Sequence, residues 1–201
     1  MTIDKPNRML HVPNLITGAR ILAVPVTVWL ILTDHLTLAF WLFALAGVSD
    51  AADGMIARLF RARTKLGGWL DPTADKLLLI GTYVAMAATN MIPVWLLLLV
   101  LLRDIVVVIG IAVLVVGLRE KLSIQPLWVG KLNTALQLAL AALVLAVNGP
   151  GLGFDNYVIP ATFVVAACTA WSMGAYIMRG VFILRTRMGG DDDRQDGEKA
   201  E

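Results

Sequence analysis

Long apolar runs separated by short polar segments dominate this chain of 201 residues. Six runs are evident, at residues 15–33, 36–48, 77–88, 94–118, 127–147 and 157–184. A membrane-spanning helix needs roughly 20 mostly apolar residues. The runs at 36–48 and 77–88 reach that length only if their helices include the aspartate-containing segments beside them. The pattern predicts an all-α integral membrane protein with six transmembrane helices.

The composition supports a membrane protein and argues against a soluble domain. Hydrophobic residues make up 58% of the chain and charged residues only 16%, and the mean hydropathy is +0.76. A soluble domain has about 25% charged residues. The bilayer is therefore an expected partner, and no nucleic-acid partner is expected.

The distribution of Lys and Arg predicts how the helices are oriented. Cations occur in the predicted loops 58–67 and 118–127, before the first run and after the last run, whereas loops 33–36, 89–93 and 148–156 contain none. Cytoplasmic loops carry the excess of Lys and Arg, so both termini are expected in the cytoplasm. The predicted domains are an interfacial N-terminal segment (1–12), a six-helix domain (13–187) and an acidic tail (188–201) that we expect to be disordered.

Four aspartates stand out because acidic side chains are expensive at membrane depth. Asp50 and Asp53 lie three residues apart, and Asp71 and Asp75 lie four apart, so each pair shares one helical face. The short basic connection makes the two helices antiparallel neighbours, whose acidic faces can meet near the cytoplasmic surface. Oxygen ligands without His or Cys suit Mg²⁺ or Mn²⁺. The alternative is that these acids form interfacial salt bridges with nearby Arg and Lys side chains.

Small residues lie beside the first acidic pair. Gly54 and Ala57 continue the face of Asp50 at i+4 and i+7, and Arg58 follows directly. Such a bare face could accommodate a phosphate chain or a flat base, with Arg58 paired to a phosphate oxygen.

The spacing Asp-x2-Asp-Gly-x2-Ala-Arg-x8-Gly-x3-Asp-x3-Asp, from Asp50 to Asp75, resembles the signature of the CDP-alcohol phosphatidyltransferases without departure. The six-span layout is similar to that family over residues 13–185. The resemblance implies transfer of a phosphatidyl group from CDP-diacylglycerol to an alcohol, with release of CMP. It also implies a homodimer in a bacterial inner membrane or its equivalent, with the active site on the cytoplasmic side.

The resemblance further implies roles for the residues of the signature. Two metal ions would be bound by Asp50, Asp53, Asp71 and Asp75, with Asp75 also serving as the catalytic base for the acceptor hydroxyl. The CDP group would be contacted by Gly54, Ala57 and Arg58, and Gly67 would allow close approach at the start of the third span.

Two later segments bear on the acceptor. "RDIVVV" from Arg103 and "VGKLNTALQLAL" from Val129 resemble the cardiolipin synthase branch. The glycerophosphate enzymes typically have a second lysine at the position of Asn133. We therefore favour phosphatidylglycerol as acceptor, with glycerol 3-phosphate as the alternative. The candidate acceptor or lipid-phosphate residues are Arg103, Lys131, Asn133 and Gln137.

The acceptor candidates could instead have purely structural roles. Arg103 could instead bridge to an acid within the bundle, and the strip formed by Gly130, Asn133, Thr134 and Gln137 could serve helix–helix hydrogen bonding. Two other functions also remain: a divalent-cation transporter that uses the same acids, and a catalytically silent assembly subunit.

Overall fold

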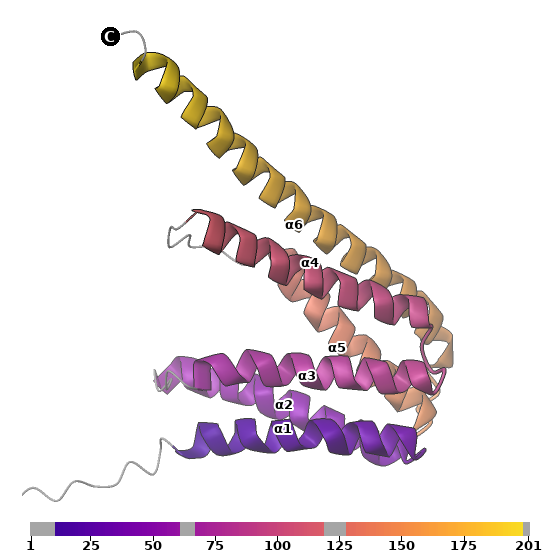
Figure 1. The fold of residues 1–201 in the computed structure, drawn as a ribbon. Helices are drawn as coiled ribbons and strands as arrows, with labels where there is room; N and C mark the ends of the chain where they lie inside the picture. The colour runs from indigo at the N-terminus through magenta and orange to yellow at the C-terminus, as the bar shows by residue number, and fades with distance from the viewer. Residues whose placement is uncertain (1–10, 61–66, 119–127, 199–201) are drawn as a thin grey trace, which may run out of the picture. The chain divides into compact units, whose positions relative to one another are not determined.

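The computed structural model describes the backbone of residues 11–60, 67–118 and 128–198, and the side chains of residues 21–49, 76–110 and 128–181. Within these ranges all regular structure is α-helical (Figure 1). The helices are α1 (His11–Leu32), α2 (Leu36–Phe60), α3 (Gly67–Ala88), α4 (Val94–Leu118), α5 (Trp128–Asn148) and α6 (Asp155–Glu198). The all-α prediction is confirmed.

Among the described residues, two helical stretches are long and apolar enough to cross a membrane. They are Trp128–Asn148 and Asp155–Val181, each with a mean hydropathy of 1.6. The number of helices in the described ranges equals the predicted number of spans, while the six crossings and their orientation stay predictions.

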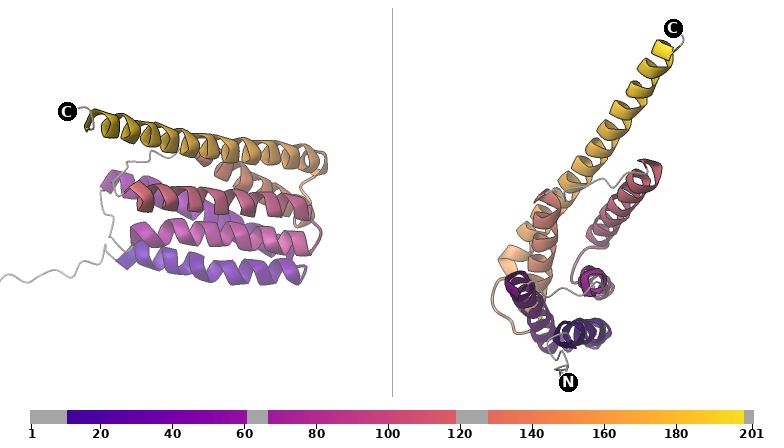
Figure 2. Two further views of the ribbon diagram at one scale, coloured as in Figure 1. Left: turned by 45° about the horizontal axis from the view of Figure 1, so that its top comes forward. Right: turned by 90° about the vertical axis from the view of Figure 1, so that its left-hand side faces the viewer.

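The chain forms two compact units, Met1–Leu97 with Gln137–Ala161 and Leu98–Leu136 with Thr162–Glu201. In the first unit, α1 packs against both α2 and α3, as Figures 1 and 2 show. The buried Tyr83 hydroxyl donates a hydrogen bond to the backbone carbonyl of Gln137 at 3.0 Å. A Cβ atom at Gly81 would lie 3.1 Å from Val28 and 3.3 Å from Val24, so α1 approaches α3 closely at this glycine.

Both short apolar runs extend into helices that include the aspartates. Asp50 and Asp53 lie within α2, and Asp71 and Asp75 lie within α3. This part of the prediction is confirmed for the backbone.

The first and last helices define the described ends of the chain, and the predicted domain boundaries stay predictions. Helix α1 begins at His11, and residues 1–10 lie outside the described ranges. Helix α6 continues to Glu198, although the sequence predicts disorder from residue 188. After Pro160 the helix contains no proline, although the stretch from residue 189 includes glycines and aspartates, which are poor helix formers.

The connection between α5 and α6 depends on glycines. Gly151 and Gly153 have φ angles of 67° and 70°, the left-handed region that glycine adopts without strain. Gly149 is needed for another reason, because a Cβ atom there would lie 2.7 Å from both the carbonyl carbon and the oxygen of Leu36. The backbone at the start of α2 therefore packs directly on this turn.

We predict that Gly149→Ala lowers the free energy of unfolding by about 1–3 kcal/mol, because a backbone segment must move to admit the methyl group. Gly47→Ala is the matched control, since a Cβ atom at Gly47 meets nothing within 4 Å. Unfolding in detergent micelles, followed by circular dichroism, checks the difference. Equal stability of the two variants would show that the turn is not tightly packed.

Candidate substrate-binding site

The four aspartates of the signature lie at similar depths on two helices. Helix α2 ends at Phe60 and α3 begins at Gly67, so these two termini lie at the same end of the first unit (Figure 1). At about 1.5 Å of rise per residue, the aspartates of both pairs lie roughly 6–15 Å along their helices from those termini. The side chains of Asp50, Asp53, Asp71 and Asp75 lie outside the described ranges.

The backbone also locates the other signature residues. Gly54, Ala57 and Arg58 follow the first acidic pair within α2, and Gly67 is the first residue of α3, so both helices extend into the predicted loop 58–67. Their side-chain contacts lie outside the described part of the chain. The donor set is made of carboxylates on two consecutive helices, which fits Mg²⁺ or Mn²⁺ by ligand type.

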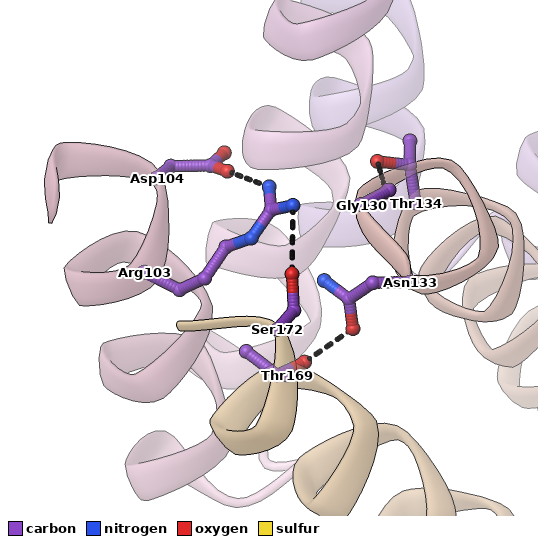
Figure 3. Close-up of polar contacts among 7 residues, drawn as sticks. All are labelled: Arg103, Asp104, Gly130, Asn133, Thr134, Thr169 and Ser172. Carbon is purple, nitrogen blue, oxygen red and sulfur yellow. Dashed lines mark hydrogen bonds and ion pairs between the residues drawn. The ribbon is translucent and has the colours of Figure 1, made fainter. Parts of the chain in front are cut away.

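A second polar cluster lies in the other unit and is centred on Arg103 (Figure 3). Its side chain extends from α4, where only 5% of the residue is exposed. Nη1 donates to the Asp104 carboxylate at 2.7 Å, and Nη2 donates to the Ser172 hydroxyl of α6 at 3.2 Å. The alternative that Arg103 bridges to an acid is therefore realised by its immediate neighbour.

Asn133 lies in the same cluster and is fully buried on α5. The Thr169 hydroxyl of α6 donates to its side-chain oxygen at 2.8 Å. Figure 3 shows the amide nitrogen of Asn133 on the side of Arg103 and Ser172. Helix–helix hydrogen bonding by the α5 strip is thus confirmed for Asn133, whereas the Thr134 hydroxyl donates within its own helix to Gly130.

Two donors of this cluster have no acceptor. Nε of Arg103 and the side-chain nitrogen of Asn133 are buried without a hydrogen-bond partner. An unsatisfied buried donor costs about 1–3 kcal/mol, and more for a charged group. Because both atoms are donors, an incoming group that satisfies them must supply acceptor oxygens.

The other two predicted acceptor residues lie apart from these contacts. Lys131 is exposed, and its Nζ lies 5.6 Å from the centroid of the Trp128 ring. Gln137 is buried one turn beyond Asn133. Its backbone carbonyl oxygen accepts the hydrogen bond from the Tyr83 hydroxyl. Arg103 and Asn133 thus both form hydrogen bonds with side chains of α6. The roles of Lys131 and Gln137 stay predictions.

Helix α6 supplies residues that sequence reasoning missed. Thr169 and Ser172 are fully buried, and the ring of Tyr176 lies against Arg103, with the guanidinium carbon 5.9 Å from its centroid. The three residues are spaced i, i+3 and i+7, which places them on one helical face. That spacing is the signal that could have found them, although the surrounding residues are mostly apolar.

Comparison with known proteins identifies the class. The chain belongs to the CDP-alcohol phosphatidyltransferase family, whose model matches residues 10–176. It is 35% identical over 152 residues to the human "Cardiolipin synthase (CMP-forming)", an alignment that covers 67% of this chain and 50% of that protein. A Streptomyces coelicolor protein of the same name is 35% identical over 114 residues, covering 54% of this chain and 53% of the relative.

A second kind of relative is also similar. The rice chloroplastic "CDP-diacylglycerol--glycerol-3-phosphate 3-phosphatidyltransferase 1" is 33% identical over 190 residues, covering 84% of this chain and 56% of that protein. This chain spans about half the length of the curated relatives it matches.

We predict that Arg103→Met lowers the free energy of unfolding by about 1–3 kcal/mol, because the Asp104 carboxylate and the Ser172 hydroxyl lose the guanidinium that bonds to them. The double variant Arg103→Met/Asp104→Leu should recover most of the loss, since it removes both charges. Unfolding in mixed SDS micelles measures both values.

Leu102→Met is the control for this series, because it changes an exposed apolar neighbour of similar volume on α4. If the double variant is less stable than Arg103→Met alone, the ion pair is not what stabilises this region.

Proposed function

We propose that this protein is a multi-pass membrane enzyme that transfers the phosphatidyl group of CDP-diacylglycerol to phosphatidylglycerol, giving cardiolipin and CMP. Its family supports the reaction type, and the names of its human and Streptomyces relatives support this acceptor. The charge distribution among the predicted loops supports six spans, cytoplasmic termini and a cytoplasmic active site.

The residues of α2 and α3 fit the donor half of the reaction. Asp50, Asp53, Asp71 and Asp75 would hold two Mg²⁺ or Mn²⁺ ions, which supply charge neutralisation for the diphosphate when bound. Asp75 accepts the proton of the acceptor hydroxyl as the oxygen attacks the phosphatidyl phosphorus. Positioning of the donor and acceptor accounts for much of the rate.

The remaining signature residues fit the nucleotide. Gly54 and Ala57 leave space on α2 for the cytidine and its diphosphate, Arg58 pairs with a phosphate oxygen, and Gly67 admits the substrate at the start of α3. An arginine suits this position because its guanidinium can bind phosphate through two parallel hydrogen bonds.

Within the structure, the observation that supports this acceptor is the ion pair between Arg103 and Asp104. The carboxylate balances the cation, so this pair brings no net charge to the cluster. A phosphodiester has one negative charge, whereas a phosphomonoester carries about −1.5 to −2 at neutral pH and favours additional cations. Arg103 and Asn133 offer unpaired N–H groups to the phosphodiester, and Lys131 and Gln137 stay candidates from the sequence alone.

Glycerol 3-phosphate is the second candidate acceptor. The rice relative whose name contains this substrate aligns with a larger share of this chain than the human cardiolipin synthase does. Family membership argues against the divalent-cation transporter, and the intact set of four aspartates argues against a silent assembly subunit.

We predict that purified enzyme given CDP-diacylglycerol, Mn²⁺ and equal amounts of both acceptors forms cardiolipin as its main product. Thin-layer chromatography of the labelled lipids distinguishes cardiolipin from phosphatidylglycerophosphate. Phosphatidylglycerophosphate as the main product would show that glycerol 3-phosphate is the preferred acceptor. Absence of CMP release with both acceptors would reject the proposed enzymatic activity.

We predict that Asp75→Asn lowers kcat by about 10²- to 10⁴-fold, the usual contribution of a positioned base. CMP release measures kcat, and circular dichroism checks that the helices are retained. Asp34→Asn is the control, because Asp34 is exposed in a turn at a φ of 62°, which asparagine tolerates. Wild-type turnover in Asp75→Asn would exclude this residue as the base.

A further inference from the structure

Gly130 of α5 is the point where the Arg103 and Tyr176 side chains meet the backbone of a third helix. A Cβ atom on Gly130 would lie 2.9 Å from the Tyr176 hydroxyl oxygen and 3.2 Å from Nη2 of Arg103. The first distance is shorter than carbon and oxygen atoms adopt without a bond. A glycine at position 130 therefore allows both the Tyr176 hydroxyl and the Arg103 guanidinium to lie against the α5 backbone.

The Tyr176 ring also limits how the guanidinium can lie. Its centroid is 5.9 Å from the guanidinium carbon of Arg103, within the range in which a cation is attracted to an aromatic ring. The two terminal nitrogens are held by Asp104 and Ser172. Nε is left as the buried nitrogen of Arg103 without an acceptor.

These contacts hold Arg103 in one orientation before any ligand binds. An arginine side chain loses up to about 2 kcal/mol of rotamer entropy when it is fixed. A guanidinium that is already fixed by a ring, a carboxylate and a hydroxyl does not lose this entropy again when it binds an anion. Its remaining N–H is then directed at one place.

We propose that Tyr176 is a positioning residue for the acceptor lipid: its ring holds the Arg103 guanidinium over Gly130, so that Nε is presented to the acceptor phosphodiester. This inference rests on the proposed function, because it assigns the anion to the acceptor. It differs from a purely structural role, in which Tyr176 fills space between helices and affects stability alone.

The test compares Tyr176→Leu with Tyr176→Phe in steady-state kinetics with mixed micelles. Loss of the ring should raise the KM for phosphatidylglycerol roughly two- to thirtyfold, the range set by a cation–ring contact from exposed to desolvated surroundings. The KM for CDP-diacylglycerol and kcat should stay within about twofold, well below the roughly 10²- to 10⁴-fold effect of losing a positioned base. Tyr176→Phe keeps the ring and should keep the acceptor KM.

Two further variants complete the comparison. Gly130→Ala should raise the acceptor KM like Tyr176→Leu, because the new methyl group displaces both the hydroxyl and the guanidinium. Tyr157→Leu is the matched control, since Tyr157 also lies on α6 but is 63% exposed, and it should leave both KM values unchanged. An unchanged acceptor KM in Tyr176→Leu, or an equal rise for both substrates, would overturn the proposal.

A measurement without turnover separates this inference from the proposed function. Replacing phosphatidylcholine by phosphatidylglycerol in the micelles should raise the Tm of the wild type and of Tyr176→Phe, but not that of Tyr176→Leu. If the wild type forms no cardiolipin yet shows this pattern of Tm changes, the proposed reaction is rejected and the proposed anion-binding site at Arg103 is retained. If the wild type shows no phosphatidylglycerol-dependent rise, or Tyr176→Leu shows the same rise, the role of Tyr176 is rejected.

Discussion

The buried charge of Arg103 is the constraint around which its unit is organised. Helix α4 exposes a stripe of apolar side chains, Leu98, Leu102, Ile105 and Ile109, each more than 50% exposed. The predicted membrane placement of α4 would put this stripe against hydrocarbon, where an unpaired cation is expensive. Arg103 lies buried instead and bonds to partners within the protein. Asp104 supplies the opposite charge and Ser172 supplies a hydroxyl. Small or polar residues must then line the facing helices, which is where Gly130, Asn133 and Thr169 are found.

Much of the fold follows from the hydrophobic pattern. The six apolar runs predict helices where the structure has them, and the prediction that two runs extend through the aspartates is confirmed by α2 and α3. The least predictable boundary is the end of α6, because its last residues are polar, have no apolar periodicity and include glycines and aspartates of low helix propensity.

The site could be predicted only in part. The aspartate signature was recognisable because its residue types and spacing are specific, whereas the Arg103 cluster joins residues far apart in sequence. The Arg103–Asp104 pair was difficult to predict, because adjacent residues on a helix do not face each other. It forms because the long arginine side chain can fold back to a neighbouring carboxylate. The part played by Tyr176 depends on Gly130 lacking a side chain, a relation that no periodicity reveals.

The unsatisfied groups of this cluster explain why it suits a ligand better than a purely structural role. Arginine presents five N–H donors and no acceptor, and the Asn133 amide adds two more donors. The hydrogen bonds described within the cluster use an acceptor for each terminal nitrogen of Arg103, and the Asn133 oxygen already accepts from Thr169.

The cluster thus has more hydrogen-bond donors than acceptors, while its central ion pair, Arg103 with Asp104, has no net charge. In a network that had only to join helices, the side-chain nitrogen of Asn133 would be a standing cost, because a buried donor without an acceptor is destabilising. A ligand with several acceptor oxygens and a single negative charge can accept hydrogen bonds from these donors, and it brings less negative charge beside the Asp104 carboxylate than a doubly charged ligand would. A phosphodiester has these two properties, and this match is the physical reason for assigning the cluster to a lipid acceptor.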